Sequence, residues 1–193
     1  MRVLPMGVDP REFPFRERAR TAAEPFRVLT VARLVEIKGL EFSIRAAAKL
    51  RETMPNVRYD IIGDGPLRAK LERSRGVEVG GCGDFSWRAR EFARKQFMAE
   101  AHAFVLASVT MEGDEKGRGW CCRRLSARLL VIATRHGAFP EGMRADESGF
   151  LVPERDADAL AERLLFWRLI PRLRGKWEQQ GENLRRKSST RAS

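Results

Sequence analysis

Short apolar runs alternate with segments of helical periodicity over most of this chain. Such alternation is typical of a parallel sheet whose strands are joined by crossover helices. It therefore predicts an α/β fold, a parallel sheet with helices on both faces. The expected strands are residues 26–32, 57–62, 103–108, 129–134 and 149–152, and the expected helices are residues 40–51, 67–73, 88–101 and 156–168.

Two of the expected helices, the first and the last, have a clear apolar face. The residues that recur there at helical spacing are Phe42, Ala46 and Leu50 in the first helix and Leu160, Leu164 and Trp167 in the last. Pro66 suits the first turn of the helix expected at 67–73. Residues 76–87 contain four glycines and little pattern, so only a short strand and a loop are expected there.

The formal net charge of +11 is confined to two segments. Residues 116–128 contain five basic residues and no acidic one, and residues 168–193 contribute a net charge of +6, so the rest of the chain is neutral. A basic excess favours polyanion partners, but the chain has one Tyr and no nucleic-acid motif. No specific nucleic-acid partner is expected. A basic module that binds polyanions through these two segments remains an alternative.

The sequence contains no run of about 18 apolar residues, the length that a membrane span requires, and residues 1–13 lack the apolar stretch of a secretory signal. A cytoplasmic location is therefore expected, and contact with a membrane surface is not indicated. The 3 cysteines include the adjacent pair Cys121 and Cys122, which fits neither a disulfide framework nor the spacing of zinc ligands.

The chain is expected to contain one folded domain. Residues 171–193 are basic and have few apolar residues to bury, so they are expected to be a disordered tail. Residues 26–170 then form the domain, and residues 1–25 form a lead-in segment.

Ligands of open parallel sheets bind beyond the carboxyl ends of the strands, so the strand-to-helix connections are the candidate sites. After the first strand, Arg33 and Lys38 could both face one diphosphate, with Gly39 allowing a close approach; two solvated cations are the alternative. The glycines of residues 63–66 indicate a tight turn but no specific chemistry. Residues 133–141 form a loop of small residues after a later strand.

The other candidate catalytic side chains are weaker. The chain has 2 histidines. His102 enters a strand and is expected to be a packed residue rather than a base, whereas His136 lies in a loop where it could contact a ligand. Ser108 has no nucleophile-elbow motif and no base near it in the sequence.

Six motifs in order resemble the C-terminal half of the retaining glycosyltransferases of family 4. They are PMGVD at 5–9, VARLVEIKG at 31–39, IGDGP at 62–66, AFVLAS at 103–108, VIAT and HGAFPE within 131–141, and SGFLVP at 148–153 followed by DADAL at 156–160. Each motif alone is weakly specific. Their shared order and spacing extend the resemblance over residues 3–168.

The resemblance implies a GT-B enzyme, in which two Rossmann-like domains face a cleft and the second domain binds a nucleotide-diphosphate sugar. Transfer would retain the anomeric configuration, with no cofactor besides the donor substrate and no obligatory metal. Arg33 and Lys38 would hold the donor diphosphate and stabilise the charge on the leaving nucleotide.

The resemblance also implies roles for four residues of two further loops. Gly63 and Gly65 would form part of the wall on the nucleotide side. His136 and Gly137 would lie in a loop that faces the cleft and would contact the donor.

The same resemblance expects two glutamates eight positions apart after the strand at 103–108. Counted back from VIAT, they fall on Glu115 and Arg123; counted forward from residues 117–119, they fall on Lys116 and Arg124. Glu115 is the candidate catalytic residue. An arginine replaces the ribose-binding glutamate in either register, and a guanidinium has only donors. Catalysis by this chain alone is therefore expected to be impaired.

An apolar segment is also expected where residues 118–128 contain four arginines, which would be costly to bury. One hypothesis is that residues 117–129, and the tail after Pro171, are read from a shifted frame. Members of the family usually begin with an acceptor-binding domain, whereas this chain begins after it. The expected partners are therefore the nucleotide sugar and a separate N-terminal acceptor domain, and a non-catalytic degenerate fragment is the alternative.

Overall fold

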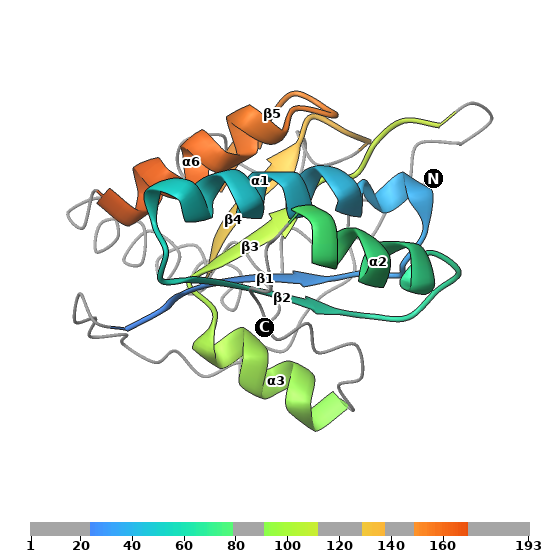
Figure 1. Cartoon of the computed structure of the whole chain (residues 1–193), viewed down its shortest axis with the longest axis horizontal. Helices are drawn as coiled ribbons and strands as arrows, with labels where there is room; N and C mark the ends of the chain where they lie inside the picture. Colours follow the sequence, from blue (N-terminus) through green and yellow to red (C-terminus); the bar gives the residue numbers. More distant parts are fainter. Residues whose placement is uncertain (1–23, 79–90, 112–128, 138–148, 170–193) are drawn as a thin grey trace, which may run out of the picture.

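Five parallel strands form the centre of the fold, in the spatial order β2-β1-β3-β4-β5. The computed structural model describes residues 24–78, 91–111, 129–137 and 149–169 (Figure 1). The strands are β1 (Phe26–Val31), β2 (Val57–Ile62), β3 (Ala103–Leu106), β4 (Leu130–Thr134) and β5 (Gly149–Val152). Every neighbouring pair is parallel, so all five carboxyl ends lie at one edge of the sheet.

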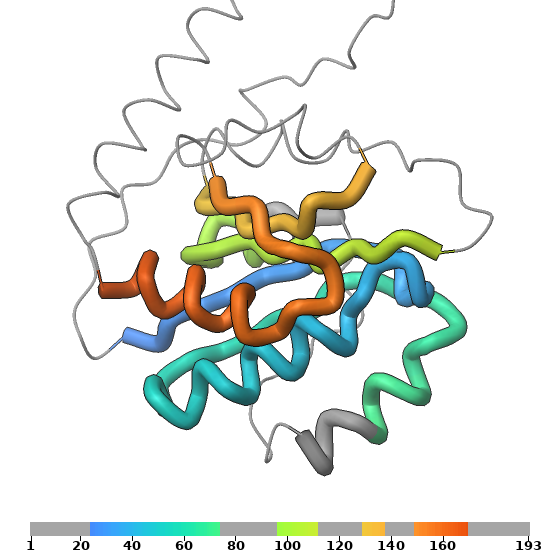
Figure 2. The backbone as a smooth tube through the Cα atoms, turned by 90° about the horizontal axis from the view of Figure 1, so that it is seen from above, coloured from blue at the N-terminus to red at the C-terminus, as the bar shows by residue number. Residues whose placement is uncertain are grey.

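Helices cover both faces of this sheet. Helices α1 (Leu40–Thr53), α2 (Arg68–Glu78) and α6 (Ala157–Leu169) lie side by side on one face with α1 in the middle, as Figure 2 shows from above. Helix α3 (Glu91–Glu100) lies on the other face, where its Phe97 and Met98 pack against β1 and β3. The predicted fold class, a Rossmann-like parallel sheet with helices on both faces, is confirmed.

The apolar character of the strands matches the covering of both faces of the sheet. All side chains of β3 and β4 are buried, as is typical of inner strands of a parallel sheet. In β1, Val28 belongs to the apolar core under α1 and α6, and its neighbour Leu29 belongs to the core on the opposite face. The apolar runs of the sequence therefore correspond to strands that are buried on both faces.

The apolar faces predicted for the first and last helices are confirmed. In α1, Phe42, Ala46 and Leu50 are buried, and in α6, Leu160, Leu164 and Trp167 are buried. The two helices pack against each other, and an exposed ion pair joins Lys49 to Asp158 across them. The carboxylate of Asp156 caps α6 by accepting a hydrogen bond from the N–H of Ala159 at 2.8 Å.

A buried polar chain connects three strands in the core. The hydroxyls of Tyr59 and Thr30 are 2.8 Å apart, and the Thr30 hydroxyl donates to the carbonyl oxygen of Val105 at 2.7 Å. Burial raises the pKa of Tyr59 to about 12, against the smaller opposite effects of hydrogen bonds with Ser43 and Thr30. The network holds β2, β1 and β3 together with satisfied polar groups.

The boundaries of some elements differ from the prediction. Helix α2 begins at Arg68, so Pro66 lies in the preceding turn rather than in the first helical turn. The same helix continues to Glu78, and the strand or loop expected from residue 76 is therefore wrong over 76–78. A short 3-10 helix, η2 (Glu36–Lys38), precedes α1 and was not predicted.

Several predictions fall outside the described residues and stay predictions. They include the lead-in segment and the disordered tail, with the domain limits drawn at residues 25 and 171. They also include the frame-shift hypothesis for 117–129 and both alternative positions of the glutamate pair, Glu115 included. Within the part of the chain that the structure describes, no helix has the length and apolar character needed to cross a membrane.

Candidate functional site

The carboxyl edge of the sheet carries every described residue that the sequence proposed as a site. Arg33 and Lys38 follow β1, Gly63 and Gly65 follow β2, and the pair His136 and Gly137 follows β4. Because β1 lies between β2 and β3, the loops after β1 and β2 are neighbours at this edge. The loop after β4 lies on the other side of the chain that leaves β3. Glu115 lies outside the described residues.

The loop between β1 and α1 is held in place by backbone hydrogen bonds from both sides. On the β2 side, the N–H of Leu34 donates to the carbonyl of Asp64 at 2.9 Å, and the N–H of Leu67 donates to the carbonyl of Leu34 at 3.1 Å. On the β3 side, the N–H of Val109 donates to the carbonyl of Ile37 at 2.9 Å. The Leu34 side chain is fully buried. A fixed backbone therefore carries the two cations of this loop.

Arg33 and Lys38 differ in exposure on this fixed loop. Arg33 is exposed, and Lys38, at the end of η2, is partly buried. The next residue, Gly39, precedes α1 without any side-chain cap. The first N–H groups of a helix carry partial positive charge, so the start of α1 adds to the charge of Lys38 beside it. Glu36 in η2 and Glu41 in the first turn of α1 bring the opposite charge to the same end of the loop, so anion binding here stays a prediction.

The glycines of these loops allow the chain to approach itself closely. A Cβ atom on Gly63 would lie 1.8 Å from the carbonyl oxygen of Ala32, and one on Gly39 would lie 2.0 Å from that of Ala107. Gly65, with φ of +157°, would place a Cβ 2.5 Å from the carbonyl oxygen of Leu34. The close approach at Gly39 is therefore to the backbone carbonyl of Ala107, just after β3. A wall role for Gly63 and Gly65 stays a prediction.

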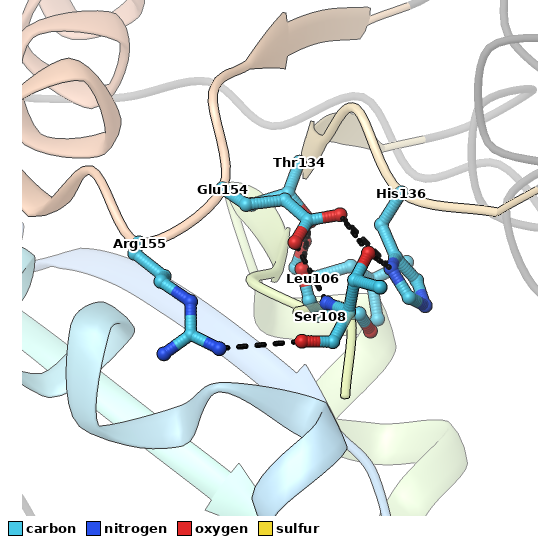
Figure 3. A network of polar contacts seen from close by, with 7 residues as sticks. Leu106, Ser108, Thr134, His136, Glu154 and Arg155 are labelled. Atoms are coloured by element: carbon cyan, nitrogen blue, oxygen red, sulfur yellow. Dashed lines mark hydrogen bonds and ion pairs between the residues drawn. The ribbon is translucent and has the colours of Figure 1, made fainter. Parts of the chain in front are cut away.

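A second group of polar contacts joins the ends of β3, β4 and β5 (Figure 3). The carboxylate of Glu154, just after β5, accepts hydrogen bonds from the N–H of Thr110 at 2.7 Å and from its hydroxyl at 2.9 Å. Nδ1 of His136 lies 3.0 Å from the same carboxylate. His136 is buried, with 7% of its surface exposed. One carboxylate thus joins the segment after β3 to the loop after β4.

These hydrogen bonds favour the charged form of Glu154. Burial by itself would raise the pKa of this carboxyl group. The hydrogen bonds from the N–H and hydroxyl of Thr110, together with the ring of His136, have a larger effect than burial. They hold the pKa of Glu154 below its ordinary value. Glu154 is therefore an anion throughout the neutral range.

Two further contacts tighten the same corner. Arg155 donates from its guanidinium to the carbonyl of Thr110 at 3.2 Å, and its backbone has a φ of 61°, a left-handed conformation that is uncommon outside glycine. The Thr134 hydroxyl donates to the carbonyl of Ser108. Ser108 is 1% exposed, so the low expectation for it as a nucleophile agrees with its burial.

Sequence reasoning missed Glu154, Thr110 and Arg155. The strand-end rule used for the other loops could have found Glu154, because it follows the expected strand at 149–152. Their mutual contacts span 44 residues or more and depend on the order of the strands.

His102 lies at the opposite, amino-terminal edge. Its Nδ1 accepts a hydrogen bond from the N–H of Arg27 at 2.7 Å, and its ring stacks on Phe26 with ring centres 5.7 Å apart. It is 7% exposed. The prediction that His102 is a packed residue is confirmed.

A cavity of about 350 Å³ borders the first turns of α1. Its lining includes Lys70, Val109, Met111 and Arg155, together with the start of the helix. Arg33, Lys38 and His136 are not among its lining residues, so the cavity flanks the candidate site and does not contain it. Among the described residues, no group of three or more His, Cys, Asp or Glu could hold a metal ion.

The described residues form a Rossmann-like domain whose loop after β1, at the carboxyl edge of a parallel sheet, carries Arg33 and Lys38. Residues 25–167 match the family described as glycosyl transferases group 1, and the chain belongs to that family. Its described part has the fold of the C-terminal half of a GT-B glycosyltransferase.

The curated relatives are longer than this chain. The chain is 37% identical over 165 residues to the putative colanic acid biosynthesis glycosyltransferase WcaL of Escherichia coli, a match that covers 82% of this chain and 40% of that protein. It is 34% identical over 166 residues to the amylovoran biosynthesis glycosyltransferase AmsK of Erwinia amylovora, covering 84% of this chain and 40% of that protein. The chain thus spans less than half the length of either relative.

A solved structure of similar extent is the C-terminal domain of the group 1 glycosyl transferase LpcC from Francisella tularensis. It superposes with a TM-score of 0.73 at 23% sequence identity, and the match covers 92% of this chain and 96% of that one. This likeness supports the fold.

Proposed function

We propose that this domain binds the nucleotide-diphosphate sugar used by a glycosyltransferase that retains the anomeric configuration. The observation that carries the proposal is the fixed loop after β1, which carries Arg33 and Lys38 at the carboxyl edge and ends at the start of α1, where no side chain caps the helix. Two side-chain cations and a helix N-terminus suit a diphosphate. A structural neighbour, HepE from Anabaena, was solved with UDP and glucose (TM-score 0.68, 20% identity, covering 84% of this chain and 44% of that one).

In this proposal the cations of the β1 loop act on the leaving group. As the bond between the sugar and the diphosphate of the donor breaks, negative charge develops on the diphosphate oxygens of the leaving nucleotide. Arg33 and Lys38 would stabilise that charge, without an obligatory metal. Gly63 and Gly65 would form the nucleotide-side wall, and His136 and Gly137 would contact the donor.

The acceptor would bind to another domain. In the proposal, an N-terminal acceptor domain faces the carboxyl edge and closes the cleft. Glu115 would lie near the donor sugar, and an arginine at 123 or 124 would stand where a carboxylate otherwise accepts hydrogen bonds from the ribose hydroxyls. Donor binding with impaired transfer by this chain alone is the expected result. The cytoplasmic location stays a prediction.

Calorimetric titration with UDP, GDP and ADP tests the proposal. We expect at least one of the three nucleotides to bind the full chain, and Arg33→Ala or Lys38→Ala to weaken that nucleotide about tenfold or more, since hydrogen bonds to charged groups contribute about 1.5–3 kcal/mol. Arg58→Ala is the matched control, because Arg58 is also exposed but lies near the start of β2. Absence of binding by all three nucleotides would overturn the proposal.

A further inference from the structure

We propose that Glu154 is a positioning residue, whose carboxylate fixes the orientation and the proton position of the His136 ring at the carboxyl edge. The inference rests on the proposed function in one respect, because His136 matters for the donor only if the donor binds at this edge. Glu154 itself is not proposed to touch the donor.

Two hydrogen bonds from Thr110 hold the Glu154 carboxylate, one at each oxygen, in addition to its contact with His136. One oxygen, Oε2, accepts the backbone N–H of Thr110 at 2.7 Å, and the other, Oε1, accepts the Thr110 hydroxyl at 2.9 Å. Oε1 also lies 3.0 Å from Nδ1 of His136. The carboxylate therefore has little freedom to rotate, and a ring bonded to it shares that constraint.

The identity of the neighbours determines which ring nitrogen carries the proton. The Thr110 hydroxyl lies 3.4 Å from Nδ1, but its single proton is directed to Glu154. An ionised carboxylate only accepts hydrogen bonds, so Nδ1 must carry a proton in order to bond to it. In the neutral ring, Nε2 is then the acceptor nitrogen, and it lies on the side of the ring away from Glu154 (Figure 3).

The strand order makes this a fixed corner. Thr110 follows β3, His136 follows β4 and Glu154 follows β5, and these are consecutive strands of the sheet. Arg155, which bonds to the Thr110 carbonyl, keeps a left-handed backbone conformation that its own side chain disfavours. Surrounding contacts must therefore hold the turn after β5, and with it Glu154, in one conformation.

The proton position can be read directly by NMR of the ring nitrogens. The chain has 2 histidines, so the signals of His136 are those that disappear in His136→Ala. His102 is an internal reference of the opposite kind, because its Nδ1 accepts an N–H and its proton must lie on Nε2. At about pH 9, where an ordinary imidazole is neutral, we expect His136 to be protonated on Nδ1 and His102 on Nε2.

Glu154→Gln removes the negative charge and one of the two acceptor oxygens of the side chain. Its amide offers one acceptor oxygen to three donors, and its NH₂ group would favour a ring that accepts at Nδ1. We expect His136 to move to the Nε2-protonated form and nucleotide affinity to fall about tenfold, as for the loss of one hydrogen bond. Glu162→Gln, on the exposed side of α6, makes the same charge change and should alter neither measurement.

A second variant keeps the test decisive if Glu154→Gln does not fold. Thr110→Ala removes one hydrogen bond to the carboxylate but leaves the contact with His136, so His136 should stay protonated on Nδ1. The inference is overturned if wild-type His136 is mainly protonated on Nε2, or if Glu154→Gln changes neither the proton position nor the affinity. If the wild-type chain binds no nucleotide, the proposed function falls, and the ring-nitrogen spectra still decide whether Glu154 positions His136.

Discussion

The two edges of the parallel sheet each bury one histidine, and each histidine is 7% exposed. At the amino-terminal edge, His102 stacks on Phe26 and accepts the backbone N–H of Arg27. At the carboxyl edge, His136 contacts a carboxylate that also binds the segment after β3. Burial alone does not separate the two residues. The direction of the strands does, because it determines which histidine lies beside the loops that can bind a ligand.

The largest expected effect comes from the backbone contact that holds the carboxyl edge together. Gly63→Ala places a Cβ 1.8 Å from the carbonyl oxygen of Ala32, so the loops after β1 and β2 must separate. We expect a loss of about 3 kcal/mol or more in the free energy of unfolding, measured with urea, and loss of nucleotide binding. Ala69→Gly, at an exposed position of α2, should cost only about 1 kcal/mol. Equal losses in the two variants would contradict the contact.

Replacing each histidine in turn tests the comparison between the edges. His102→Ala leaves the N–H of Arg27 without its acceptor and removes a stacked ring, so we expect it to lower the free energy of unfolding by about 2 kcal/mol. Nucleotide affinity should not change, because His102 is at the far edge. His136→Ala should weaken nucleotide binding as well as the fold. Calorimetry and urea unfolding of both variants measure the two effects, and a weaker affinity in His102→Ala would break the comparison.

The dependence of stability on alkaline pH tests the buried hydrogen bonds of Tyr59 and Thr30, which lie in the core between the two edges. The folded pKa of Tyr59 is raised above its unfolded value of 10 to about 12 by burial. The neutral phenol is therefore favoured in the folded state, and the stability it contributes is present below pH 10 and is lost as the pH rises from 10 toward 12. Tyr59 is the single Tyr of the chain, so its ultraviolet titration is read without overlap from other tyrosines. In Tyr59→Phe this loss of stability should disappear.

The smallest expected effect is a loss of stability at acid pH, which arises from Glu154 at the carboxyl edge. The folded pKa of Glu154 is lowered from its ordinary 4.5, because hydrogen bonds from Thr110 and His136 outweigh burial. The stability it contributes is therefore present above pH 4.5 and is lost as the pH falls through the lower, folded pKa. Melting temperatures of wild type and Glu154→Gln should converge over this interval. A constant difference between them down to low pH would contradict the contact.

Much of the fold could be predicted from the sequence, because the apolar runs of buried parallel strands are local signals. The buried faces of α1 and α6 follow from helical spacing in the same way. The end of α2 could not be predicted, because a glycine at position 76 is unfavourable in a helix and suggested an earlier end. Tertiary context overrides such local preferences.

The candidate site was predictable only in part. The position of Arg33, Lys38 and His136 at the carboxyl edge could be predicted because they follow strands, and strand ends share an edge in a parallel sheet. The partnership of Glu154 with Thr110 and His136 could not be found in the same way, since it depends on β3, β4 and β5 being neighbours in that order. A sequence shows which residues follow strands, whereas side-chain pairing between loops requires the strand order.

The most direct test of the central claim is an amide NMR spectrum of the full chain recorded during titration with the nucleotide that calorimetry selects. We predict that the shifts are concentrated at residues 31–39, 63–65, 67 and 134–137, which belong to the carboxyl edge. The amide signals of residues 56–58 and 101–103, at the amino-terminal edge, should stay in place. Shifts concentrated at the amino-terminal edge, or none with UDP, GDP or ADP, would contradict it.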